Sequence, residues 1–275
     1  MPELPEVETI VQGVAPRLVG RRIRTARLTK SDVLRQVSRR RLLETLTGNT
    51  VVHAQRRAKH AVFLLRSGHR LVVQPRMTGS LIVYDRPLTK DEARYAVLVC
   101  SLSGGGQFVY RDVRRLGTVW LLDDRGWARY TARIGPEPLE PAFTVERFTQ
   151  ALAGSRAAVK KVIMDQRRLA GVGNIYANEA LFDARIDPSR PANRLTPDER
   201  RDLHAAILDV LRRALRASGT TVRDYRTGTG EPGSFQLELK AYDRGGEPCL
   251  RCGHRLVTTH AIDGRQTTLC AFCQR

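Results

Sequence analysis

The sequence has no apolar run of about 18 residues, the length that a membrane-spanning helix needs, so we expect no membrane span. It also lacks a basic segment followed by an apolar stretch, which would mark a secretion signal, and we therefore expect a cytoplasmic protein. Internal repeats and low-complexity tracts are absent as well. What is present, 275 residues with a hydrophobic fraction of 41%, suffices for two domains with real cores.

Lysine is scarce, with only six residues, yet the formal net charge is +19 and the isoelectric point is near 10.7 because arginine is abundant. So large an excess of positive charge favours a polyanionic partner, and nucleic acid is the first candidate. An anionic membrane surface is the competing partner. The sequence shows no basic amphipathic helix of the membrane-surface type, which favours nucleic acid.

Apolar periodicity divides the chain into a strand-rich and a helix-rich part. Helical spacing over Val7–Leu18 predicts a first helix. Short segments rich in β-branched or aromatic residues then predict an antiparallel sandwich or barrel, at 50–54, 61–66, 70–74, 80–84, 95–100, 107–110 and 117–122. Helical patterns follow at about 144–152, 156–166, 174–184 and 197–217. The sequence therefore predicts an α+β fold.

We predict five regions along the chain. They are an N-terminal β-sandwich domain at 1–134, a proline-rich linker at 135–143, a helical domain at 144–227, a glycine-rich connection at 228–246 and a cysteine segment at 247–275.

Four of the five cysteines form a terminal cluster with the spacing of a metal site. Two Cys-x-x-Cys knuckles suit tetrahedral Zn²⁺ and supply Cys249, Cys252, Cys270 and Cys273. Because four sulfurs close the coordination sphere, we expect a structural ion. The residues between the knuckles predict a β-hairpin, with Arg265 just after its turn. Arg265 is either a solvated hairpin residue or an arginine presented to a phosphate or sugar.

The first residues of the chain form a candidate catalytic site. An α-amino group has a pKa of about 7.7–8.0, so Pro2, freed by removal of Met1, would be partly neutral and nucleophilic near neutral pH. A secondary amine attacks a sugar aldehyde carbon to give an iminium, and Glu3 and Glu6 would serve proton transfer beside it. The alternative is that Pro2, Pro5 and the acidic residues simply start a helix.

A glycine-containing segment predicts a phosphate-binding element in the helical part. Gly171 and Gly173 permit close backbone approach, and we expect Asn174 to cap the following helix. Exposed amides at a helix N-terminus bind phosphate, and basic side chains lie nearby in sequence. No strand precedes the segment, so a dinucleotide-binding motif is excluded.

Together these motifs resemble the formamidopyrimidine-DNA glycosylase/endonuclease VIII family of bacterial base-excision repair enzymes, over essentially the whole chain. PELPEVET at 2–9 is similar to the N-terminal signature of the formamidopyrimidine branch, and QRRAKH at 55–60 to the segment with the catalytic lysine. Residues 165–179 resemble the helix–two-turns–helix, and the cysteine segment resembles the C-terminal β-hairpin zinc finger.

The resemblance implies the catalytic roles. Pro2 attacks the sugar C1′ and forms the Schiff base, and Glu3 donates the proton that helps to open the sugar and release the base. Lys59 is assigned to β-elimination, and Arg265 to δ-elimination and a contact with the lesion's phosphate. Glu6 supports the N-terminal site.

The resemblance also implies how the DNA is held. Three side chains fill the hole left by the flipped base: Met77, Arg114 and Leu116. Leu116 stands where the family usually has phenylalanine, so it keeps an apolar wedge but loses aromatic stacking. A loop at 220–240, with Tyr225 as a candidate contact, covers the extruded base. Backbone-phosphate contacts are assigned to Tyr95, Arg115, Arg156, Lys160 and Asn174.

We therefore expect a monomeric DNA glycosylase and AP lyase that excises oxidised purines, such as 8-oxoguanine and formamidopyrimidines, from double-stranded DNA in the bacterial nucleoid. The same protein should also act on abasic sites. Three alternatives remain open: an endonuclease VIII-like enzyme for oxidised pyrimidines, a non-catalytic zinc-containing DNA-binding protein, and a transcription regulator.

Overall fold

The computed structural model describes residues 2–220 and 233–275. The chain divides into two compact units. The first comprises Met1–Ala132 with the described part of Ala217–Ser234, and the second comprises Arg133–Arg216 and Phe235–Arg275. The five regions drawn from the sequence stay a prediction.

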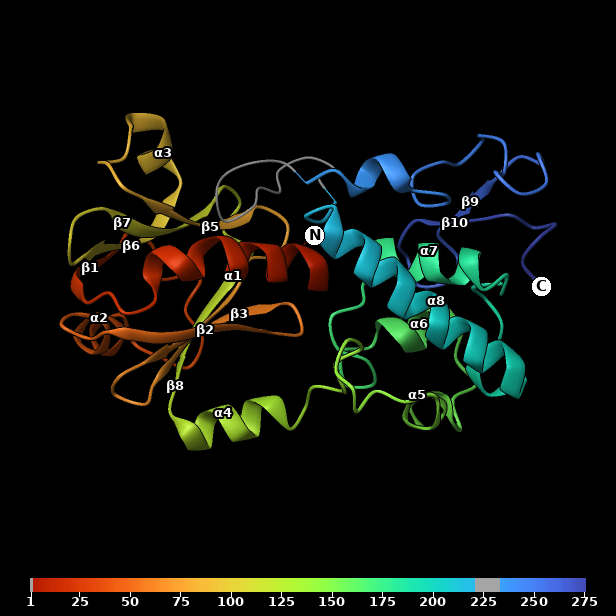
Figure 1. Cartoon of the computed structure of the whole chain (residues 1–275), viewed down its shortest axis with the longest axis horizontal. Coiled ribbons are helices and arrows are strands. Elements are labelled where there is room, and N and C mark those ends of the chain that lie inside the picture. The colour runs from red at the N-terminus through yellow and green to blue at the C-terminus, as the bar shows by residue number, and fades with distance from the viewer. Residues whose placement is uncertain (1, 221–232) are drawn as a thin grey trace. The chain divides into compact units, whose positions relative to one another are not determined.

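The first unit is built on two four-stranded antiparallel sheets (Figure 1). One has the strand order β1-β6-β7-β5, with bounds Ile23–Leu28, Ala96–Leu102, Gln107–Asp112 and Gly79–Tyr84. The other has the order β2-β3-β4-β8, with bounds Val51–Arg57, His60–Leu65, Arg70–Gln74 and Thr118–Leu122. Each of the seven segments predicted from the sequence overlaps one of these strands, which confirms the antiparallel sandwich.

Helix α1 (Leu4–Leu18) packs against both sheets. Its buried face includes Val7, Ile10, Val14 and Leu18, which share one apolar core with residues of the two sheets. The helix begins just after its N-cap residue Glu3, with Pro5 in the first turn. Proline suits a first helical turn because its missing N–H has no helical partner there. Pro2 precedes the cap and lies outside the helix.

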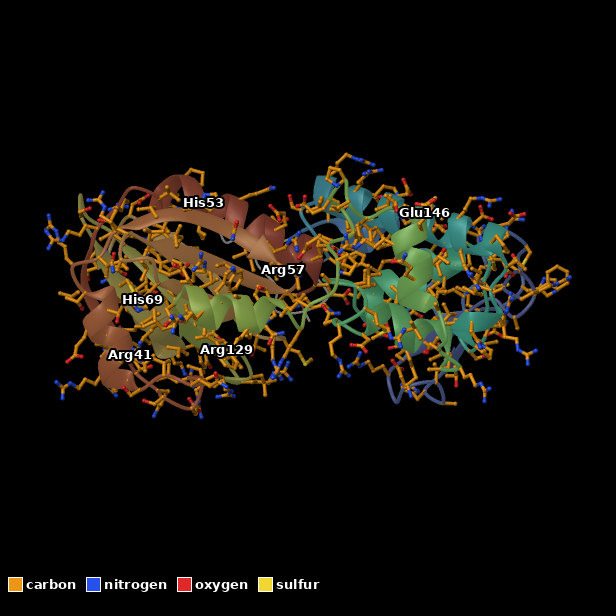
Figure 2. The ribbon with its side chains drawn as sticks, turned by 90° about the horizontal axis from the view of Figure 1, so that it is seen from below. Arg41, His53, Arg57, His69, Arg129 and Glu146 are labelled. Carbon is orange, nitrogen blue, oxygen red and sulfur yellow. The ribbon has the colours of Figure 1, made fainter. Side chains whose placement is uncertain are left out.

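Sequence patterns missed four elements of the first unit: β1, α2 (Arg39–Leu46), α3 (Lys90–Arg94) and α4 (Asp124–Thr131). The signal for α4 was present, because the side chain of Asp123 accepts a hydrogen bond from the Gly126 amide, 2.7 Å away, as an N-cap. Helix α4 lies across the β2-β3-β4-β8 sheet; Figure 2 labels Arg129 on the helix and Arg57 at the end of β2.

The second unit is mainly helical and ends in a two-stranded hairpin. Thr196 and Glu199 form a capping box at the start of its longest helix, α8. The helices are α5 (Val145–Leu152), α6 (Val159–Met164), α7 (Asn174–Asp183) and α8 (Pro197–Arg216); the hairpin strands are β9 (Val257–Thr259) and β10 (Thr267–Leu269). Within the described ranges, no helix is both long and apolar enough to cross a membrane.

Candidate functional site

The candidate nucleophile stands at the buried start of the first unit. Pro2, Glu3 and Glu6 are all buried. The Glu6 carboxylate bridges two segments, because Oε2 accepts a hydrogen bond from the Glu3 amide at 2.7 Å and Oε1 accepts one from the Thr220 amide, also at 2.7 Å. Each carboxylate oxygen therefore accepts a backbone N–H from a different segment. Glu6 thus fixes the backbone directly after Pro2.

Only glycine fits beside this carboxylate at position 219. The φ of Gly219 is +82°, and a Cβ there would lie 2.9 Å from Oε1 of Glu6. A side chain would be strained by its backbone and would also crowd the Glu6 carboxylate. The Glu6–Thr220 bond therefore depends on this glycine.

Lys59 lies in the two-residue turn that joins β2 to β3. Its side chain is largely buried, and Arg57 pairs with His60 across the turn. Ala58, the first turn residue, has a φ of +51°, and Lys59 is not in the positive-φ region. A positive φ at the first position alone is the pattern of a type II′ turn. This tight turn sets the direction in which Lys59 leaves the sheet.

Arg56 connects the Lys59 turn to the helix that follows Pro2. Its Nε lies 2.9 Å from Oε2 of Glu8 on α1, and its Nη1 donates to the Ala58 carbonyl oxygen at 3.1 Å. The Arg56 side chain is only 7% exposed, so solvent screens this ion pair less than a surface pair. Within this unit, Arg56 thereby holds the segments that carry two of the predicted catalytic residues.

The three predicted void-filling residues lie on two loops that share one support. Met77 and Leu116 are 47% and 41% exposed although they are apolar, and Arg114 is exposed as well. Beneath them, the buried carboxylate of Asp112 accepts hydrogen bonds from Thr78 Oγ1 at 2.5 Å and from the Gly117 amide at 2.8 Å. The two loops are therefore joined through one side chain.

Two further bonds complete this support. The Thr78 hydroxyl accepts a hydrogen bond from the Arg114 amide at 3.2 Å, and the Tyr110 hydroxyl donates to Asp112 at 2.9 Å. Burial and the neighbouring Asp112 carboxylate raise the pKa of Tyr110, so its hydroxyl keeps its proton and can donate. Sequence reasoning did not single out Asp112, Thr78 or Tyr110, since nothing local reveals that they converge.

Two predicted phosphate contacts of this unit already have partners. Arg115 forms an ion pair with Asp32, with 2.7 Å between Nε and Oδ2, and has a positive φ of 51°. Tyr95 is the C-cap residue of α3 rather than the first residue of a strand, and the Arg94 guanidinium lies over its ring. Their roles toward DNA stay predictions.

The four terminal cysteines form a cluster that fits one zinc ion. Their sulfur atoms all lie within 4.8 Å of one another. The Sγ–Sγ distances are 4.0 Å for Cys249–Cys273 and 3.5 Å for Cys252–Cys270. Bonds of about 2.3 Å in a tetrahedron place thiolates about 3.8 Å apart, so the observed spacing suits Zn²⁺. Disulfide-bonded sulfurs would be about 2.0 Å apart, so these pairs are not disulfides.

Arg265 is exposed on the loop between β9 and β10. This loop spans 260–266 and is longer than the tight turn expected from the sequence. Side chains of α6 and α7 hold its far end: Lys160 Nζ donates to Thr267 Oγ1 at 2.7 Å and to the Gln266 carbonyl oxygen at 3.2 Å. Lys160 is fully buried and lies 3.6 Å from the Asp263 carboxylate.

Asn174 is not the helix cap that the sequence suggested. Gly173 occupies the N-cap position of α7 and Asn174 is the first helical residue, with no side-chain cap bond. The side-chain amide of Asn174 instead donates to the Gln266 carbonyl oxygen at 3.0 Å, so Asn174 supports the same loop as Lys160. Arg156 is exposed in the segment before α6. Tyr225 lies outside the described residues.

Comparison with known proteins identifies the family of this chain. Three family models match: the N-terminal domain of formamidopyrimidine-DNA glycosylase over 1–119, its H2TH domain over 134–226, and a zinc finger found in FPG and IleRS over 246–275. The formamidopyrimidine-DNA glycosylase of Roseiflexus sp. is 42% identical over the full length of both chains. This chain belongs to the formamidopyrimidine-DNA glycosylase family. The family predicted from the sequence is therefore confirmed.

Solved structures of the family share the fold. A Lactococcus lactis FPG mutant in complex with Fapy-dG-containing DNA has a TM-score of 0.90 and 32% identity, with all of both chains covered. The MutM (Fpg) protein of Thermus thermophilus has a TM-score of 0.87 and 35% identity, covering 99% of this chain and 98% of that one. The α+β fold with its zinc finger is thus confirmed, and the four cysteines hold one structural zinc ion.

Proposed function

We propose that this protein is a bifunctional DNA glycosylase and AP lyase that excises oxidised purines from double-stranded DNA and acts at abasic sites. The observation that carries the proposal is the buried N-terminal segment, where Glu6 fixes the backbone after Pro2 in a chain 42% identical to a formamidopyrimidine-DNA glycosylase. The related Lactococcus lactis complexes contain Fapy-dG or abasic-site DNA, which supports this substrate class. The proposal also includes a monomer that acts on nucleoid DNA.

In this proposal, each step of the reaction is assigned to one residue. The Pro2 amine attacks C1′, the glycosidic bond breaks, and Glu3 supplies the proton that helps to open the sugar. The resulting iminium makes a C2′ proton acidic; its removal, assigned to the step at Lys59, expels the 3′ phosphate. A second elimination, assisted by Arg265, expels the 5′ phosphate. The zinc ion has no part in these steps because its four sulfur ligands leave no open position.

Borohydride reduction in the presence of abasic DNA tests the nucleophile. We expect a covalent protein–DNA adduct on Pro2 and a mass that shows Met1 to be removed, because only a free N-terminal amine can form the iminium. Peptide mapping of the adduct locates the bond. No adduct, or an adduct on a lysine that forms in equal yield with Pro2→Gly, would exclude Pro2 as the nucleophile.

Lesion choice needs a separate comparison. Excision rates for 8-oxoguanine and thymine glycol in the same duplex context should favour the purine. Faster release of thymine glycol would support the endonuclease VIII-like alternative and contradict our substrate assignment.

The shared support of the two loops predicts the effect of Thr78→Val. The variant removes the hydroxyl that donates to Asp112 and accepts from the Arg114 amide. An unpaired buried carboxylate oxygen costs about 1–3 kcal/mol of unfolding free energy, measurable by urea denaturation. Because the loop that carries Arg114 is loosened, discrimination between the bases opposite the lesion should also fall.

The matched control is Thr25→Val, at an exposed position on β1 of the same sheet. It should leave both stability and opposing-base preference close to the wild type. Equal behaviour of the two variants would show that Thr78 does not hold the two loops that carry Met77, Arg114 and Leu116.

A further inference from the structure

His60 joins the Lys59 turn to helix α4. Its Nδ1 lies 3.1 Å from the Arg57 carbonyl oxygen, and its Nε2 lies 2.8 Å from the Tyr130 hydroxyl. A carbonyl oxygen only accepts, so Nδ1 must carry a proton. Burial raises the pKa of Tyr130 to about 12, so its hydroxyl stays protonated and can donate to Nε2. Both ring nitrogens are therefore held.

Tyr130 is itself fixed by packing on the sheet face opposite the main core. Its ring lies 5.3 Å from the Trp120 ring and stacks on Trp127 at 6.2 Å, centroid to centroid. These aromatic rings cover a small apolar cluster of Val62, Val72 and Leu122. An ion pair of 2.7 Å between Arg70 and Asp124 ties the start of α4 to β4. These contacts fix the position of the Tyr130 hydroxyl.

The turn between these anchors is short and strained. Ala58 holds a positive φ, which costs a non-glycine residue energy, and neighbouring interactions must maintain it. Arg56 bonds the Ala58 carbonyl oxygen on one side of the turn, and Tyr130 holds His60 on the other. Lys59 is the residue between these two held positions.

We propose that Tyr130 and His60 are positioning residues that hold the Lys59 amine for β-elimination. The inference rests on the proposed role of Lys59. Neither residue needs to touch DNA. The Tyr130 hydroxyl on α4 fixes the His60 ring, and the His60 ring fixes the end of the β2–β3 turn. That turn sets the direction of the Lys59 amine. Helix α4, which sequence patterns missed, thereby has a part in the reaction.

Tyr130→Phe tests this series of contacts because it removes the Tyr130 hydroxyl and keeps the packing of the ring. In single-turnover reactions on 8-oxoguanine duplex, base release and strand cleavage are followed separately, together with borohydride trapping. We expect base release and trapping to remain near wild type, and strand cleavage to slow about tenfold, less than the roughly 100-fold that a 1 Å misplacement can cost. In a Lys59→Ala background, Tyr130→Phe should have no further effect.

Two controls separate positioning from general destabilisation. Tyr84→Phe removes a hydroxyl from β5 in the other sheet, and Leu28→Ala lowers stability by removing buried apolar atoms from β1, a strand of that same sheet. Both variants should keep the wild-type ratio of strand cleavage to base release. Equal slowing of both steps by Tyr130→Phe, or an undiminished effect without Lys59, overturns the proposal. Failure of the wild type to be trapped would instead refute the proposed function.

Discussion

Lys160→Met should lower the free energy of unfolding by about 3–5 kcal/mol and weaken DNA binding, because it removes one partner from a buried charged network. The Lys160 ammonium is fully buried and bonds Thr267 and Gln266, with the Asp263 carboxylate nearby. Without it, Thr267 Oγ1 and the Asp263 carboxylate lose the Lys160 ammonium, and the loop that carries Arg265 keeps the Asn174 bond to Gln266 but loses its buried cation. Amide hydrogen exchange of the free protein should show lower protection of β10.

Lys161→Met is the matched control. Lys161 is the next residue, is exposed, and carries the same charge. Its replacement should leave hydrogen exchange of β10 unchanged. If the two variants show the same β10 exchange in the absence of DNA, Lys160 does not support the loop, and a direct phosphate contact becomes the better explanation of any lost affinity.

Glu6→Gln should reduce base excision by about 100-fold, the cost of misplacing a reacting group by about 1 Å. Glu6 accepts two backbone hydrogen bonds, one on each carboxylate oxygen. Glutamine has a single acceptor oxygen, so its amide N–H would face one of the two backbone N–H groups. Borohydride trapping should fall with base release, because both would depend on the position of Pro2, the proposed nucleophile.

Glu44→Gln provides the comparison for Glu6→Gln, since Glu44 is an exposed residue of α2 with an i,i+4 ion pair to Arg40. It should retain full activity. Wild-type rates of excision and trapping in Glu6→Gln would show that the carboxylate does not position the N-terminus. Glu6→Gln should slow base release and lower trapping together, whereas Tyr130→Phe should slow strand cleavage and leave trapping near wild type.

Local sequence patterns predicted those parts of the site that are formed by residues close together in the chain. The paired cysteine knuckles predicted the zinc ion, and the helical pattern at about 197–217 predicted α8. Short segments rich in β-branched or aromatic residues also predicted most strands. Helix α4 escaped because Gly126 and its aromatic residues lower helix propensity, although Asp123 marked its start.

The supports of the site could not be predicted in the same way, since their partners are distant in sequence. Lys160 reaches Thr267, and His60 reaches Tyr130, only after the chain has folded. Asn174 shows how a sound local rule fails: asparagine favours a cap position, yet Gly173 takes the cap and the Asn174 amide bonds the Gln266 carbonyl oxygen.

The convergence of Thr78, Tyr110 and Gly117 on Asp112 has an evolutionary consequence. Exposed residues at the tips of the two loops can be substituted more freely than the buried Asp112 at their base. A substitution at Leu116 would alter the predicted DNA wedge without breaking any bond to Asp112. A change at Asp112 would disturb both loops and with them the predicted void-filling residues Met77, Arg114 and Leu116. Substrate preference in this lineage should therefore diverge through single replacements at the tips, with the carboxylate beneath them retained.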